Sequence, residues 1–141
     1  MLRMGFLAVV LLFLTGCRSF QRDWDRAASV PGDPAAGRWV GTWQNTNNTH
    51  SGPLRAVVVP APGGYRARFE AGWGRHSGSF RTRLHGTPSG DAVEFEGKRR
   101  ILGVKITTRG RADGKTFQAT YDSRFDRGTF ELKRPDGESM R

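Results

Sequence analysis

The sequence predicts an all-β fold, a small antiparallel up-and-down barrel of about eight strands. Between Gly37 and Arg134, short runs of alternating apolar and polar residues recur between turn signals, and such alternation is typical of strands with one buried face. The connectors are short enough for hairpins, so consecutive strands are expected to be neighbours. A two-sheet sandwich would give the same strand pattern, but closing the sheet into a barrel removes its exposed edges.

The chain begins with the layout of an export signal. Arg3 is the one charged side chain before an uninterrupted apolar run from Phe6 to Leu14. This run is too short to span a bilayer as a helix, which needs about 20 residues. We therefore expect residues 1–16 to be a removable signal peptide.

The segment Leu14-Thr15-Gly16-Cys17 resembles the lipobox of bacterial lipoproteins, and Cys17 is the only cysteine in the chain. The resemblance implies that Cys17 receives a diacylglycerol and becomes the first residue of the mature chain, carrying acyl chains such as palmitate. It places the protein in the bacterial cell envelope, lipid-anchored outside the cytoplasm. Arg18 after the cysteine is compatible with the outer membrane of a Gram-negative bacterium. The alternative is an ordinary secretory signal that contains a cysteine.

Residues 17–36 are expected to hold the lipidated cysteine and a tether, because Val30 to Ala36 are rich in proline, glycine and alanine. Phe20, Trp24 and Ala28 recur every four residues, which places them on one side of a short helix. Two interpretations of this helix remain open. It is either an interfacial foot on the membrane or a turn of helix that caps the domain.

We expect the β-barrel domain to span 37–134 and to be followed by a C-terminal tail at 135–141. The connectors contain the glycine, proline and aspartate residues that tight turns require. The expected strands lie near residues 38–46, 53–60, 64–71, 78–85, 91–97, 100–109, 116–123 and 128–134.

One face of most strands places a small residue between two large ones, and we expect this face to line the barrel interior. Bulky residues would then plug both ends, while small residues line the waist. The waist either holds a small apolar ligand or is filled by the aromatic rings. The candidate interior residues are Trp39, Gly41, Trp43, Ala56, Ala67, Phe69, Phe80, Ala119 and Tyr121.

Gly37-Arg38-Trp39 and Gly41-Thr42-Trp43 each resemble the Gly-x-Trp motif that opens the first strand of lipocalins and related calycins. The resemblance covers this strand and the architecture. It implies a lipocalin-like barrel in which the tryptophan closes one end and a basic residue near the last strand, here Lys133 or Arg134, packs across it. The chain departs from the family in its shorter domain and in lacking a Thr-Asp-Tyr motif, so the resemblance implies no ligand.

The outer face is basic, in keeping with a net charge of +10. A turn between Ala71 and Ser77 sets a register that pairs Arg66 with Arg83 and Arg68 with Arg81. Like charges opposite one another destabilise a strand pair. These four arginines are therefore a candidate site for anionic groups, with further cations near in the chain at Arg75, Lys98, Arg99 and Arg100. Alternatively, they only keep the barrel soluble.

No motif indicates catalysis. His50, His76 and His85 lack the spacing of a zinc site, and no serine lies in a Gly-x-Ser-x-Gly elbow. We expect no catalytic residue, no metal ligand and no cofactor.

Together these features predict a non-enzymatic, lipid-anchored barrel that binds an anionic or small apolar envelope component. The expected partners are the membrane and anionic lipid, lipopolysaccharide or peptidoglycan. Nucleic acid is disfavoured because the lipobox places the domain outside the cytoplasm. The alternative is a structural or protein-interaction module of the envelope that has no small-molecule ligand.

Overall fold

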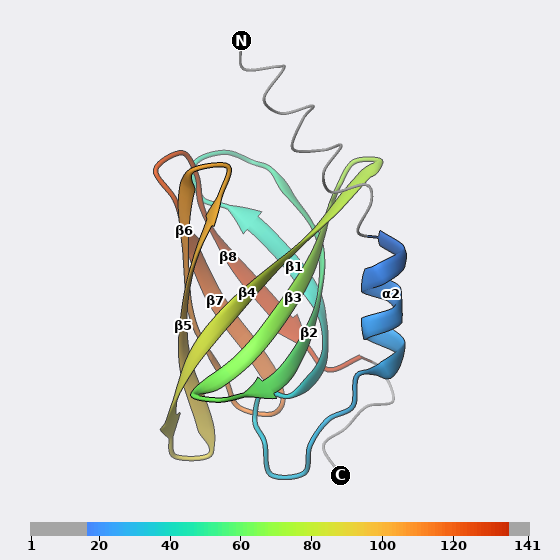
Figure 1. Ribbon diagram of the computed structural model, residues 1–141. Helices are drawn as coiled ribbons and strands as arrows, with labels where there is room; N and C mark the ends of the chain where they lie inside the picture. Colours follow the sequence, from blue (N-terminus) through green and yellow to red (C-terminus); the bar gives the residue numbers. More distant parts are fainter. Residues whose placement is uncertain (1–16, 136–141) are drawn as a thin grey trace.

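The computed structural model describes residues 17–135, in which one helix lies beside a closed barrel of eight antiparallel strands (Figure 1). Helix α2 spans Cys17–Arg26. The strands are β1 (Gly37–Asn45), β2 (Ser51–Ala61), β3 (Gly64–Trp73), β4 (His76–Ser89), β5 (Ala92–Ile101), β6 (Val104–Ala112), β7 (Thr116–Asp122) and β8 (Arg127–Lys133).

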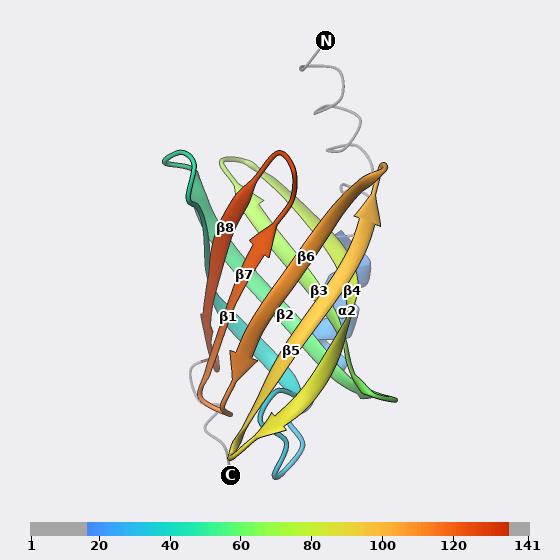
Figure 2. The ribbon, with the colours of Figure 1, turned by 90° about the vertical axis from the view of Figure 1, so that its left-hand side faces the viewer.

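Each strand pairs with the next along the chain, and β8 pairs with β1 to close the sheet. The expected all-β up-and-down barrel is therefore confirmed. Successive strands reverse direction, so the four hairpins that join an odd-numbered strand to the next even-numbered strand have their turns at the same end of the barrel (Figure 2). These turns are called the odd-to-even hairpin tips. The expected signal peptide, residues 1–16, and residues 136–141 of the expected tail lie outside the described residues.

The expected boundary between the fifth and sixth strands is wrong. β5 continues to Ile101, and the hairpin turns at Leu102-Gly103 rather than between residues 97 and 100. Both turn residues have positive φ, 52° and 80°, as two-residue hairpins of the I′ type require. Asn-Gly or Asp-Gly usually signals such a turn, and Leu-Gly does not, so the sequence pattern misplaced it.

The barrel interior is filled by aromatic rings that meet across it. Phe69 on β3 lies 6.2 Å from Phe117 on β7 and 5.3 Å from Phe130 on β8, measured between ring centroids. Phe117 also contacts Phe95 at 4.8 Å and Trp39 at 5.5 Å. Strands β3 and β7 lie on opposite sides of the barrel, so rings that touch between them leave the waist occupied.

All nine candidate interior residues lie on the inner face. Trp39, Ala56, Ala67, Phe69 and Ala119 belong to the buried core, and Trp43, Phe80 and Tyr121 are half-buried against it. Gly41 lies where β1 and β8 approach most tightly, because a Cβ there would lie 1.8 Å from the Glu131 carbonyl oxygen. The small residues therefore make room for the neighbouring rings and strands.

Trp39 and Arg134 close one end of the barrel. The Arg134 guanidinium lies 3.9 Å from the centroid of the fully buried Trp39 ring. Arg134 also donates hydrogen bonds to the carbonyls of Gly114 (3.2 Å) and Arg38 (3.1 Å). The basic partner that the lipocalin resemblance implied is thus Arg134, and it packs across Trp39.

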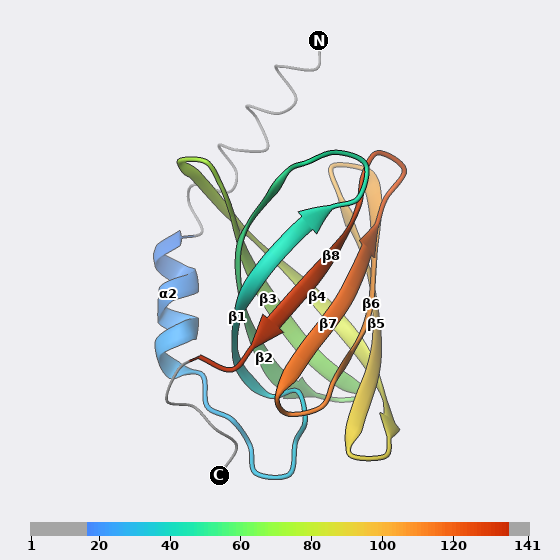
Figure 3. The same cartoon turned by 180° about the vertical axis from the view of Figure 1, so that it is seen from behind.

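The segment 27–36 passes below this closed end (Figure 3). Ala35 and Ala36 are buried, and the Ala35 carbonyl accepts a hydrogen bond from the Trp39 indole at 2.8 Å. Asp33 accepts hydrogen bonds from the backbone of Ala35 and Ala36 and from the Tyr65 hydroxyl, all within 3.0 Å. The region expected to be a tether therefore packs against the barrel instead of standing away from it.

Replacing Trp39 with alanine should lower the free energy of unfolding by about 3–5 kcal/mol, because a fully buried ring would leave a large cavity. Trp43→Ala should cost clearly less, since the Trp43 ring is only half-buried. Urea titration of both variants followed by circular dichroism measures the difference. Equal losses would contradict the assignment of Trp39 as the ring that closes the barrel.

Candidate anion-binding groove

Helix α2 lies along the outside of the barrel, next to β2, β3 and β4 (Figure 3). Its sequence is strongly amphipathic, and Phe20 on the inner side is fully buried. The Arg55 guanidinium lies 4.9 Å from the ring centroids of both Phe20 and Trp24, a distance at which cation–π attraction operates. The second interpretation of this helix, a helix that caps the domain, is the arrangement observed.

The C-terminal turn of α2 is held by Arg38 from β1. Its guanidinium donates to the carbonyls of Trp24 at 2.6 Å and Asp25 at 3.1 Å, and it lies 5.5 Å from the Trp24 ring. The last carbonyls of a helix have no partner within the helix, so a cation here satisfies them and interacts favourably with the helix dipole. Arginines of the barrel thus contact α2 at two places, Arg55 at the Phe20 ring and Arg38 at the C-terminal carbonyls.

The β3–β4 register is the predicted one, with Arg66 opposite Arg83 and Arg68 opposite Arg81. Arg68 nevertheless does not belong to the exposed surface expected for it. It is only 7% exposed, forms a 2.7 Å ion pair with Asp23 of α2 and lies 5.6 Å from the Phe20 ring. The helix covers Arg68, so this arginine serves the docking of α2 and not the binding of an external anion.

The pairing between β4 and β5 covers only part of either strand. It runs from Ser89↔Ala92 to His85↔Glu96 and ends there, while β5 continues beside β6 alone. Gly97 still touches β4, because a Cβ there would lie 2.6 Å from the Arg83 carbonyl oxygen. Beyond this point the two strands separate toward the end that holds the odd-to-even hairpin tips (Figure 1), and Arg99 spans the seam with a hydrogen bond to the Arg81 carbonyl.

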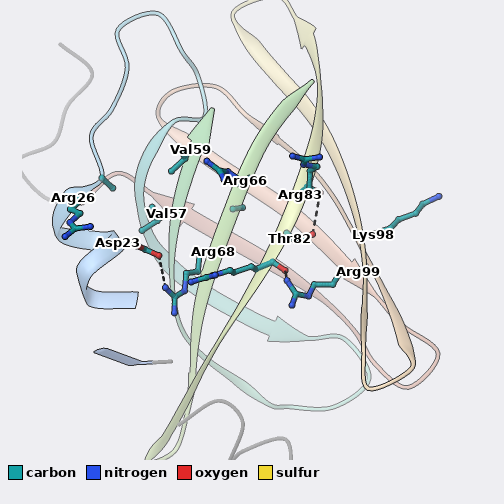
Figure 4. A pocket seen from close by; sticks show the side chains of 13 residues that line it. Asp23, Arg26, Val57, Val59, Arg66, Arg68, Thr82, Arg83, Lys98 and Arg99 are labelled. Carbon is teal, nitrogen blue, oxygen red and sulfur yellow. Dashed lines mark hydrogen bonds and ion pairs between the residues drawn. The ribbon is translucent and has the colours of Figure 1, made fainter. Parts of the chain in front are cut away.

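A groove of about 610 Å³ lies between α2 and this seam, within the size range of ligand sites. Asp23 and Arg26 enter it from α2, and Lys98 and Arg99 reach it from β5 (Figure 4). Its lining is Asp23, Arg26, Ala27, Val57, Val59, Arg66, Ala67, Arg68, Arg81, Thr82, Arg83, Lys98 and Arg99.

The groove carries a large excess of positive charge. Asp23 is the single acidic residue of its lining and is paired with Arg68. Within residues 17–135, Arg26, Arg66, Arg81 and Arg83 form no ion pair. Clustered cations without acidic partners between low-dielectric walls produce a strong positive potential, which attracts anions.

A second groove, next to the first on β5 and β6, differs in charge balance. Arg109 pairs with Glu96 at 3.1 Å and Arg111 with Glu94 at 3.6 Å. Arg83 and Lys98 line both grooves, and Lys98 also lies 3.5 Å from Glu96. The groove beside α2 has the single acid Asp23 among more cations, so it carries the larger excess of positive charge.

The groove offers cations and apolar surface but little for acid–base chemistry. The titratable groups with raised pKa values lie at the barrel ends. Burial and the hydrogen bond to Asp33 raise the pKa of Tyr65 to about 12, and burial and the charge of Asp126 raise that of Tyr121 to about 12. Backbone hydrogen bonds from Thr116 and Lys115 lower the pKa of Asp113, in an exposed turn.

The described residues contain no group of three or more histidine, cysteine, aspartate or glutamate side chains that could hold a metal ion. His50 lies in the connector between β1 and β2, whereas His76 and His85 lie nine residues apart on β4. No helix within residues 17–135 is long and apolar enough to cross a membrane.

Comparisons with protein-family models, with curated proteins and with solved structures find no match to this chain. The barrel architecture therefore rests on the chain's own strand pairing. The interpretation of the groove rests on the residues that line it.

Sequence reasoning located four arginines of the groove lining, Arg66, Arg68, Arg81 and Arg83, and missed that α2 covers Arg68 and that other cations join them. Arg26 was not considered, although it lies three residues after Asp23 on the same helix. Lys98 and Arg99 were noted only as neighbours in the chain, because the misplaced turn put them in a connector. Gly103 was the only local hint of the true turn, because Leu102 is not a residue that usually marks one.

Phe20→Ala should release α2 from the barrel without unfolding the strands, since the ring provides most of the buried apolar contact of the helix. Amide hydrogen exchange in residues 18–26 should become much faster, while exchange in β1 and β8 stays unchanged. Arg22→Ala, on the exposed side of α2, is the matched control and should leave exchange as in the parent. Slow exchange in Phe20→Ala would show that the helix is held by other contacts.

Proposed function

We propose that this protein is a lipid-anchored lipoprotein of the bacterial cell envelope whose barrel binds an anionic envelope component in the groove beside α2. The observation that carries the proposal is the positive charge of Arg26, Arg66, Arg81 and Arg83 around one groove, none of which forms an ion pair with another residue of 17–135. Cations held this close repel one another, and an anion that binds among them relieves the repulsion. The proposal includes no catalytic step.

The anchor part of the proposal rests on the lipobox resemblance, with Cys17 as the acylated residue. Several acyl chains on one cysteine bind a membrane firmly, because each buried CH₂ contributes about 0.8 kcal/mol. Helix α2 begins at Cys17 and packs on the barrel, so an anchor there would hold the barrel close to the lipid. The groove, which α2 borders, would then lie near the membrane as well.

The ligand we favour carries phosphate or carboxylate groups next to an apolar part. Arginine donates paired hydrogen bonds to such oxyanions, and the groove presents several arginines. Its lining also contains Val57 and Val59, and Val59 is exposed. An anionic lipid or the phosphorylated portion of lipopolysaccharide combines both features, whereas an uncharged apolar molecule would leave the cations unused.

The interior offers no comparable route to a ligand. The rings of Phe69, Phe117 and Phe130 contact one another across the waist, so a small apolar molecule would have to displace packed aromatic side chains. Protein interiors resist such rearrangement because they are packed as densely as organic crystals. Of the two binding routes considered from the sequence, the outer one is therefore the one we propose.

Cys17→Ser should abolish acylation and processing, because the hydroxyl does not replace the thiol that accepts the diacylglycerol. The variant should lose its partitioning into detergent and keep residues 1–16. Phase separation in detergent and mass spectrometry of the N-terminal peptide measure the two effects. An unchanged N-terminus and unchanged partitioning would exclude the lipoprotein assignment.

The triple variant Arg66→Gln, Arg81→Gln and Arg83→Gln should bind a short-chain phosphatidylglycerol at least about tenfold more weakly. A hydrogen bond to a charged group contributes about 1.5–3 kcal/mol, and about 1.4 kcal/mol corresponds to a factor of ten. Calorimetry on the chain from residue 17 with Cys17→Ser measures the affinity, and salt should weaken it. Lipopolysaccharide provides a second probe.

The matched control replaces Arg109, Arg111 and Lys133 with glutamine, which removes the same charge from exposed positions outside the groove. It should bind the phosphatidylglycerol nearly as the parent does. If both triple variants lose affinity equally, the effect belongs to net charge, and the groove is only a solubilising surface. Short-chain phosphatidylcholine should bind weakly to all three proteins.

A further inference from the structure

The odd-to-even hairpin tips form one end of the barrel, here called the tip end. It comprises the β1–β2, β3–β4, β5–β6 and β7–β8 connectors, which gather at the same end in Figures 1 and 2. The opposite end is closed by residues 27–36, Trp39 and Arg134. Helix α2 runs from the tip end toward this closed end, so its N-terminal end lies on the side of the tip end (Figure 1).

The tip end exposes two large apolar side chains. Leu102 at the β5–β6 turn is 64% exposed, and Phe125 at the β7–β8 turn is 72% exposed, the highest values among the large hydrophobic residues described. Leu102 is also the one non-glycine residue with positive φ among those described. A leucine is costly in that conformation, and stability alone would favour asparagine or glycine there.

The tip end also exposes several cations. Arg75, Arg100, Lys105 and Arg124 are exposed at the tips, and none of them takes part in an ion pair within residues 17–135. Arg100 lies directly opposite Lys105 in the β5–β6 ladder, and the Arg124 guanidinium lies 5.1 Å from the Phe125 ring. Repulsion between such neighbours is relieved by an anionic surface.

The acidic side chains at the tip end have partners within the barrel. Asp122 pairs with Arg127 at 3.0 Å, and Asp126 accepts a hydrogen bond from Asn45. The connectors at the closed end hold three aspartates, Asp33, Asp91 and Asp113. The barrel therefore has a basic end with apolar tips and an opposite end richer in acidic residues.

We propose that the tip end docks onto the surface of an anionic lipid bilayer, with Leu102 and Phe125 inserted among the headgroups and the surrounding cations at the level of the lipid phosphates. Apolar tips ringed by arginine and lysine suit the boundary between headgroups and acyl chains. The direction of α2 toward the same end supports this, a step that rests on the proposed acylation of Cys17. The occupant is thus the bilayer that holds the anchor.

Site-directed spin labels test this orientation. Cys17 is the only cysteine, so once it is acylated, a cysteine introduced by Leu102→Cys, Phe125→Cys or Asp91→Cys is the single free thiol. The labelled, acylated protein is reconstituted into vesicles of phosphatidylethanolamine and phosphatidylglycerol. Collision with oxygen, which concentrates in lipid, is compared with collision with a water-soluble nickel chelate.

Labels at positions 102 and 125 should collide more with oxygen and several-fold less with nickel than the label at position 91, at the closed end. Replacing phosphatidylglycerol with phosphatidylcholine should reduce the difference. If the labels at 102 and 125 meet nickel as freely as the label at 91, the docking is excluded. Shielding of these labels from both reagents would indicate a protein partner and exclude it too.

Two readouts separate this proposal from the proposed function. Acylated protein whose tip labels stay in water overturns the docking and leaves the anchor intact. Tip labels that enter anionic vesicles in a Cys17→Ser background support the docking, whereas mass spectrometry that finds Cys17 unacylated in the parent overturns the anchor. The triple glutamine variant of the groove should leave all label accessibilities unchanged, because none of its three sites lies at the tips.

Discussion

The interior of a small closed barrel must be filled by side chains, and this leaves the outer surface as the place where a ligand could bind. With eight strands and few small residues, the inner faces bring Phe69, Phe95, Phe117 and Phe130 into mutual contact. These rings supply the core, which has no disulfide to assist it because Cys17 is the only cysteine. The binding that we propose is therefore on the outer surface, where the chain carries its surplus of positive charge.

Arginine does two different things on that outer surface. Arg38, Arg55 and Arg68 lie under α2, where aromatic faces, helix carbonyls and Asp23 satisfy them. Arg66, Arg81 and Arg83 lie just beyond the helix and have no such partners in the part of the chain that the structure describes. Arginines on neighbouring strands thus have different roles. Those under α2 are structural, and those beside α2 are the proposed binding residues.

The sequence predicted the strands, their order and the β3–β4 register well, because alternation and turn residues report directly on these features. It also identified the stacking of a basic residue on a tryptophan, which the structure assigns to Arg134 and Trp39. It missed the covering of Arg68, since no local pattern tells which strand a ten-residue helix will pack on. The β5–β6 turn was misplaced because Leu102 stands where asparagine is usual.

The β5–β6 turn determines the positions of residues both in the groove and at the tip end. Continuing β5 past its last pair with β4 opens the seam, places Lys98 and Arg99 at the groove, and carries Leu102 out to the tip. A hairpin ending near residue 98 would remove all three features together. If the tips rest on an anionic bilayer, Lys98 and Arg99 near the tip end of β5 are the groove cations next to it, whereas Arg26 and Arg66 lie toward the closed end. An anionic lipid would then reach the groove past Lys98 and Arg99. The cations of the tips would attract anionic lipids, and the cations of the groove would then bind one of these lipids.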